Sequence, residues 1–115
     1  MQSEDKPHRS GFSGGEIATP SDLVKYQDGS IVSRVLVKNP NGTVTIFAFD
    51  EGQALSEHMV PYDALVHVLE GEVEITIDGT THHLHSCEMI LLPASQPHAV
   101  NALKRFKMIL TMIRC

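Results

Sequence analysis

Apolar residues between positions 31 and 113 fall in short runs, and in several of them they alternate with polar residues at a period of two. The clearest run is Glu72–Ile77, in which three branched apolar residues alternate with three polar ones. Such alternation predicts a strand with one face in a core and the other in water. Hardly any stretch has the 3.6-residue period of a helix. Short strands separated by turns predict an all-β sandwich or barrel.

The same pattern predicts eight further strands and the turns between them. We expect strands at residues 31–37, 43–49, 54–60, 64–70, 80–85, 89–92, 99–103 and 106–113. Turn residues stand between many of them, at 39–42, 50–52, 71 and 78–79. We expect 54–60 and 64–70 to form a pair interrupted at Pro61, because proline has no amide hydrogen for a ladder. The segments 64–70 and 106–113 are apolar on both faces, which indicates cover on both sides of the sheet.

Residues 1–20 are expected to form a flexible tail, because they carry too few sizeable apolar groups to offset the entropy of ordering. The barrel domain would then occupy residues 21–115. At its start, Leu23–Tyr26 and Ile31–Val37 predict two strands around an Asp28-Gly29 turn. A short helix from Ser21 is the alternative, because Ser21 can cap it. As a short edge strand, Leu23–Tyr26 is also a candidate for pairing with a second copy of the chain.

Size and charge narrow the function classes. A chain of 115 residues fits one domain with one apolar core. With 9 Lys and Arg against 14 Asp and Glu, its net charge of -5 argues against nucleic acid as a partner. The N-terminus lacks the apolar stretch of a signal peptide, and nothing in the sequence is long and apolar enough to span a membrane. Two cysteines in no disulfide or metal spacing favour a reducing compartment, so we expect a cytoplasmic protein.

Two histidines far apart in the sequence are the main candidates for chemistry. His58 and His98 each lie in or beside an expected strand, and a closed β structure can bring them together. The spacing around them resembles two motifs of the cupin superfamily. In the first motif, Gly52, His58 and Gly71 match, while Val60 and Ala64 stand where the family has a second histidine and a glutamate. In the second motif, Pro93 and His98 match, while Cys87, Ser95 and Ala102 stand where the family has two glycines and an asparagine, and Asn101 lies one place early.

The resemblance covers about residues 44–113 and implies a jelly-roll β-barrel that is commonly dimeric. It also implies a metal inside the barrel, held by three histidines and one glutamate. Here the candidate metal ligands are His58 and His98, for a divalent ion such as Zn, Fe, Mn or Ni. Two ligands are fewer than a catalytic divalent site usually needs. As substitutes, Asp63 and His67 have the wrong strand parity unless a bulge re-aims them, and neutral Tyr62 is a poor ligand.

Two functional hypotheses follow. In the first, a homodimeric cupin binds a small molecule in a pocket marked by His58 and His98, and resembles metal-dependent oxygenases or isomerases if it is an enzyme. In the second, the barrel is a metal-free ligand-binding or structural module in which both histidines orient a ligand. A solvated surface position is expected for Glu57 and Asp63. We expect His67 to be packed or at an interface. We expect His82, His83 and His85 at the surface of a hairpin, where such a cluster can pick up adventitious metal.

Overall fold

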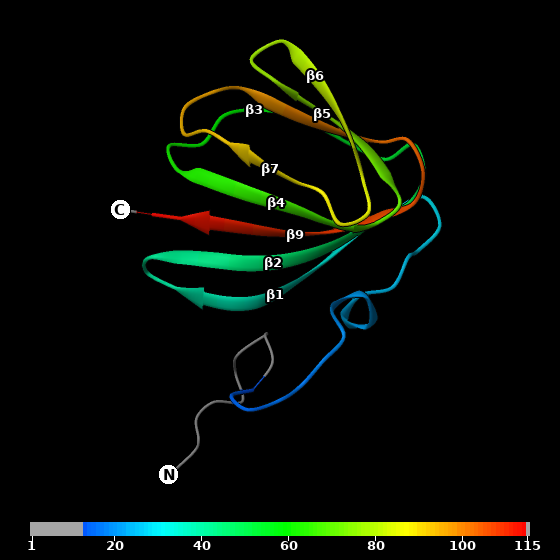
Figure 1. Cartoon of the computed structure of the whole chain (residues 1–115), viewed down its shortest axis with the longest axis vertical. Helices are drawn as coiled ribbons and strands as arrows, with labels where there is room; N and C mark the ends of the chain where they lie inside the picture. Colours follow the sequence, from blue (N-terminus) through cyan, green and yellow to red (C-terminus); the bar gives the residue numbers. More distant parts are fainter. Residues whose placement is uncertain (1–12, 115) are drawn as a thin grey trace.

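The computed structural model describes residues 13–114, and within them the chain forms two antiparallel β-sheets that face one another (Figure 1). The predicted all-β jelly-roll barrel is therefore confirmed. A short 3-10 helix η1 (Pro20–Leu23) precedes the strands β1 (Ile31–Asn39), β2 (Gly42–Phe49), β3 (Ala54–His58), β4 (Asp63–Glu70), β5 (Glu72–Ile77), β6 (Thr80–His85), β7 (Met89–Leu92), β8 (His98–Ala102) and β9 (Phe106–Ile113). No helix among these described residues is long and apolar enough to cross a membrane.

The strands are divided between a five-stranded and a four-stranded sheet. Sheet A has the order β1-β2-β9-β4-β7, and sheet B has the order β3-β8-β5-β6. Figure 1 shows sheet B above sheet A. The expected pairing of 54–60 with 64–70 is wrong, because β3 pairs with β8 and β4 pairs with β7 and β9. The chain passes from one sheet to the other between His58 and Asp63, where Pro61 prevents a continuous ladder.

The main core fills the space between the sheets. On β4 the inward residues Ala64, Val66 and Val68 are almost fully buried, and they pack with residues of β5, β8 and β9. Phe49 at the end of β2 stacks on Phe106 at the start of β9, with ring centroids 4.6 Å apart. These aromatic rings close one end of the core, since both are completely buried.

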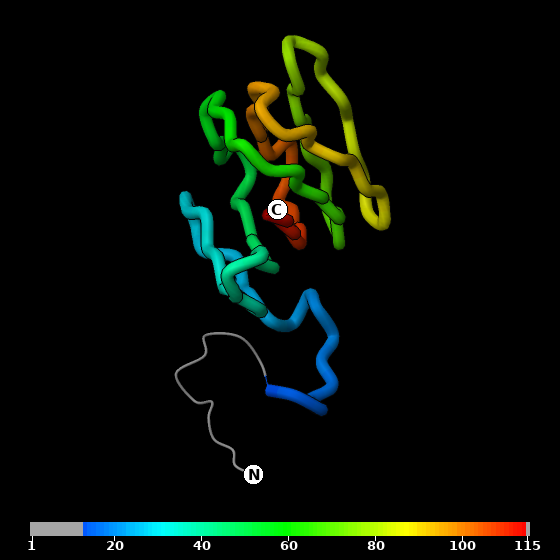
Figure 2. The backbone as a smooth tube through the Cα atoms, turned by 90° about the vertical axis from the view of Figure 1, so that its left-hand side faces the viewer, coloured from blue at the N-terminus to red at the C-terminus, as the bar shows by residue number. Residues whose placement is uncertain are grey.

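A second, smaller cluster explains why β9 and β4 are apolar on both faces. Leu69 of β4 and Ile109 of β9 pack on the outer face of sheet A against a buried cluster that contains Val24 of the segment before β1. Figures 1 and 2 show this segment, in blue to cyan, outside the barrel on the side of sheet A. The segment before β1 therefore covers the outer face of sheet A at one end, which explains the apolar residues on both faces of these strands.

The predicted hairpin at the start of the domain is wrong. Residues 20–23 form η1 and residues 24–26 are not in a strand, so the helical alternative is closer, although the cap position is Thr19 and makes no side-chain cap bond. Polar contacts hold the segment instead. Lys107 Nζ donates to the Ser21 carbonyl at 2.6 Å and lies 4.9 Å from the centre of the Tyr26 ring. The part of the predicted tail at residues 1–12 lies outside the described residues.

Tyr26 is fixed at its hydroxyl as well. Its Oη donates a hydrogen bond to Glu70 Oε2 at 2.6 Å, which ties the segment to the end of β4. Burial, followed by the hydrogen bond to Glu70, raises the pKa of Tyr26 far above its ordinary value, so the hydroxyl remains a donor at any physiological pH. Contacts of this kind cannot be read from the alternation of apolar residues.

Candidate functional site

The fold brings His58 and His98 together at the end of the β3–β8 ladder. His58 is the last residue of β3 and stands opposite His98, the first residue of β8. Their rings meet edge to face, with centroids 4.4 Å apart. On β8, His98 shares its face with the buried residues Val100 and Ala102, so the pair lies on the inner face of sheet B.

A β-bulge explains how His58 reaches this face. Leu55 stands opposite Val100 and His58 stands opposite His98, so three steps on β3 correspond to two on β8. The bulge gives Leu55 and His58 the same face, although a regular strand would separate them. His58 Nδ1 lies 3.0 Å from the carbonyl oxygen of Ser56. Since a carbonyl only accepts, Nδ1 carries the proton and Nε2 keeps a free lone pair.

His98 is the buried member of the pair. Only 6% of it is exposed, and its Nδ1 has no hydrogen-bond partner among the described residues. Burial, followed by the proximity of His58, lowers the pKa of His98, and a backbone contact with Gln96 opposes the shift only in part. His98 is therefore mainly neutral at pH 7, and Nδ1 of its buried ring lacks a hydrogen-bond partner within residues 13–114.

The lowered pKa predicts a pH-dependent stability. The unfolded chain takes up a proton on His98 more readily than the folded chain does. The free energy of unfolding is therefore highest above about pH 6.5, and it falls as the pH drops towards the pKa of His98 in the folded protein. We expect urea unfolding to show a decline in stability below about pH 6.5 that is smaller in His98→Leu. Identical pH profiles in the two proteins would contradict this assignment.

Two loops beside the pair are fastened to each other. Ser95 N donates to the Val60 carbonyl at 2.8 Å, and Ala94 N donates to Asp63 Oδ1 at 2.9 Å. Asp63 is exposed, as expected, and its carboxylate also connects the start of β4 to the loop before β8. Cys87 and Ser95, which stand where the family motif has glycines, both have positive φ, at 71° and 63°. The backbone of the motif is retained although its glycines are not.

The donors around the pair can be compared with the metal site that the motifs imply. Ala64 is 2% exposed in the core, and Val60 is half-buried beside the loops. Among the described residues, neither histidine joins a group of three histidine, cysteine or carboxylate donors within metal-binding reach. The pair offers two nitrogen donors, and this set does not match a site that usually has at least three protein ligands.

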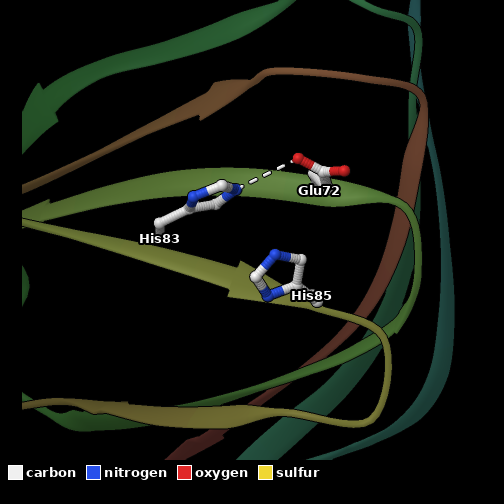
Figure 3. A group of neighbouring side chains, drawn as sticks. All are labelled: Glu72, His83 and His85. Atoms are coloured by element: carbon white, nitrogen blue, oxygen red, sulfur yellow. Dashed lines mark hydrogen bonds and ion pairs between the residues drawn. The ribbon is translucent and has the colours of Figure 1, made fainter.

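Such a three-donor group does occur elsewhere. Glu72, His83 and His85 lie on the outer face of sheet B, and their donor atoms are all within 4.8 Å of one another (Figure 3). The predicted hairpin already implies this cluster, because a turn at Asp78-Gly79 places Glu72 opposite His85. Sequence reasoning named the histidines and missed the glutamate, since the cross-strand register was not applied to that face.

The other histidines differ in their surroundings. His82 is exposed although it shares a strand face with buried Leu84. His67 on β4 is half-buried and points to the outer face of sheet A, opposite Ile109. Glu57 is exposed, as expected.

Comparison with known proteins gives the same architecture. The family model described as "Cupin domain" matches residues 45–113. A conserved Streptococcus pyogenes protein of unknown function is 29% identical, with a TM-score of 0.89 over 97% of this chain and 98% of that one. A cupin 2 conserved barrel domain protein from Leptotrichia buccalis is 42% identical, with a TM-score of 0.79 over 82% of this chain and 46% of that one.

A curated relative, polyketide synthase CurC from Streptomyces cyaneus, is 29% identical over 70 residues, which are 60% of this chain and 46% of CurC. The chain thus matches less than half the length of this relative. The family match extends over most of the strands described above, from β2 to β9, and includes both His58 and His98. The chain therefore belongs to the cupin family.

Proposed function

We propose that the protein binds a small molecule at the end of its barrel, next to His58 and His98. The supporting observation is the Nδ1 atom of His98, which is buried without a hydrogen-bond partner among the described residues. A buried polar atom left unpaired costs about 1–3 kcal/mol. Such a cost is usually retained where another group, such as a ligand, forms the missing bond.

The chemistry of the two rings suggests what the ligand carries. His58 Nε2 accepts a hydrogen bond, because Nδ1 already donates to Ser56. His98 is neutral and supplies one further donor or acceptor at Nδ1. A hydroxyl or carbonyl group on a small metabolite fits this pair, and the half-buried Val60 suits an apolar part of the same molecule.

An enzymatic function is the second candidate, and the same pair supports it. The free lone pair on His58 Nε2 is suited to act as a general base on a bound hydroxyl or carbon acid. Metal-dependent oxygenase or isomerase chemistry, which the cupin resemblance implies, needs more protein ligands than the two histidines. The polyketide connection named in CurC adds polyketones to the compounds worth testing.

The proposal is tested by screening small hydroxy acids, keto acids and polyketones for a rise in melting temperature, followed by calorimetry on the binders. We expect a compound to bind wild-type protein and to bind His58→Ala and His98→Ala at least tenfold more weakly. His82→Ala is the matched control, since His82 is exposed on the edge strand β6, which β5 separates from β8. Equal affinity in all four proteins would disprove the role of the pair. Elemental analysis of untagged protein measures its metal content and so distinguishes a metal-free site from one that holds Zn, Fe, Mn or Ni weakly.

We further propose that the protein is a cytoplasmic homodimer. The end of sheet A's outer face that η1 and Val24 leave uncovered carries large apolar side chains that are about half exposed: Val37 at 48%, Met89 at 54%, Leu91 at 51% and Ile113 at 60%. Leu91 stands beside Leu65 on this face, which gives a second copy a continuous apolar strip to cover. Cys87 is an exposed free thiol, which a reducing compartment preserves.

Light scattering coupled to size-exclusion chromatography should give a dimer mass for the wild type. Leu91→Glu places a charge in the apolar strip and should shift the mass to the monomer. Met59→Glu is the control, because Met59 is exposed at 60% in the loop between the sheets. A monomeric wild type would rule out the homodimer.

A further inference from the structure

The outer face of sheet B carries a cluster that the proposed ligand site does not use. His83 and His85 are two residues apart on β6, so both point away from the core that Leu84 enters. Glu72 on β5 stands opposite His85. In Figure 3 the three side chains converge on one space above the β5–β6 hairpin.

The distances suit a divalent metal ion. Metal–ligand bonds of about 2.0–2.2 Å in a tetrahedral site place neighbouring donor atoms about 3.4 Å apart. His83 Nε2 already lies 3.2 Å from Glu72 Oε1, and all three donors lie within 4.8 Å of one another. Shifts of about 1 Å in partly exposed side chains would complete the geometry. The hairpin thus presents three donors with little rearrangement.

A second carboxylate orients His85. Glu88 Oε1 accepts from the His85 backbone N at 2.7 Å and lies 3.3 Å from His85 Nδ1. These contacts also lower the pKa of Glu88, with the backbone bond as the main cause. Because Nδ1 faces a carboxylate, it carries the proton, and Nε2 is left with the lone pair a metal requires. Glu88 therefore occupies the supporting position that carboxylates take behind metal-binding histidines.

We propose that Glu72, His83 and His85 form a divalent transition-metal site on the outer face of the barrel, with Glu88 as the residue that positions His85. Two imidazoles and one carboxylate favour ions such as Zn²⁺, Co²⁺ or Ni²⁺ over Ca²⁺ or Mg²⁺, which prefer all-oxygen sites. Three protein ligands leave a coordination position open to water. His83 and Glu88 also line a cleft of about 370 Å³ with His82, Leu84, Met89 and Ile90, so the metal would lie at its edge.

The test is calorimetric titration of untagged, chelator-treated protein with Zn²⁺ alone. We expect one Zn²⁺ per chain at this site. His83→Ala and His85→Ala should each weaken binding about 100-fold, and Glu72→Gln should weaken it at least tenfold. Glu88→Gln should weaken it about tenfold, the lower end of what loss of a supporting carboxylate costs. Zn²⁺ should raise the melting temperature of the wild type and not that of the double variant His83→Ala/His85→Ala.

Matched controls separate this site from the others. His82→Ala removes a neighbouring exposed histidine of β6 and should bind Zn²⁺ like the wild type. His98→Ala should also leave this binding unchanged, because His98 lies on the inner face of the sheet. The proposal is overturned if wild-type protein fails to bind Zn²⁺, or if the double variant binds it with wild-type affinity. In that second case, loss of binding in His98→Ala would assign the metal to the barrel pair.

Discussion

Replacing Gly71 with alanine is expected to lower the free energy of unfolding by about 3 kcal/mol or more, and it is the most damaging single substitution we predict. Gly71 joins β4 to β5 with a φ of 87°, which L-residues rarely adopt. A Cβ at this position would overlap the carbonyl oxygen of Arg105 and lie 2.6 Å from Phe106 Cα. Both neighbours are backbone atoms and cannot rotate away, so the start of β9 would have to shift.

The control is Gly79→Ala in the next hairpin. Gly79 has a similar φ of 84°, but a Cβ there would meet nothing within 4 Å. Its cost is the conformational one alone, about 1–2 kcal/mol. Urea unfolding followed by circular dichroism measures both changes. Equal losses in the two variants would show that backbone strain, and not the contact with Arg105 and Phe106, explains the requirement for glycine at position 71.

The variant His98→Leu is expected to gain stability and to lose ligand binding. Leucine is close to histidine in size and removes the buried Nδ1 that has no partner among the described residues. Removing such an atom should raise the free energy of unfolding at pH 7 by about 1–2 kcal/mol. At the same time the pair loses a polar contact, so the affinity for any ligand found in the screen should fall at least tenfold.

The opposite signs of these two changes make the test specific. If His98 only filled the core, its replacement would leave the stability of the protein unchanged or lower it, and ligand binding would be unaffected. His82→Leu is the matched control and should change neither quantity, because His82 is exposed. A destabilised His98→Leu that keeps full ligand affinity would contradict the proposed function.

The sequence alone determined the strands and the hairpin that carries the outer cluster. The strands at 72–77, 80–85, 89–92 and 106–113 have the predicted bounds, because period-two alternation and turn residues act locally. The turn at Asp78-Gly79 fixes the register of β5 against β6, so it also placed Glu72 opposite His85. The cupin motifs likewise marked His58 and His98, although the glycines of the second motif and two of the metal ligands are replaced.

Only the tertiary structure decided how distant segments meet. The alternation of apolar and polar residues cannot predict the bulge before His58, because a bulge is defined by the pairing with the partner strand. This bulge puts His58 on the same face as His98. The segment before β1 resembles a strand in sequence, yet its conformation is set by Tyr26, Glu70 and Lys107, which are far apart along the chain. Burial of His98 with no partner for Nδ1 in the described part of the chain is likewise a property of the assembled barrel. Local residue order determines which strands form, whereas the contacts between strands determine where each side chain lies and what it leaves unsatisfied.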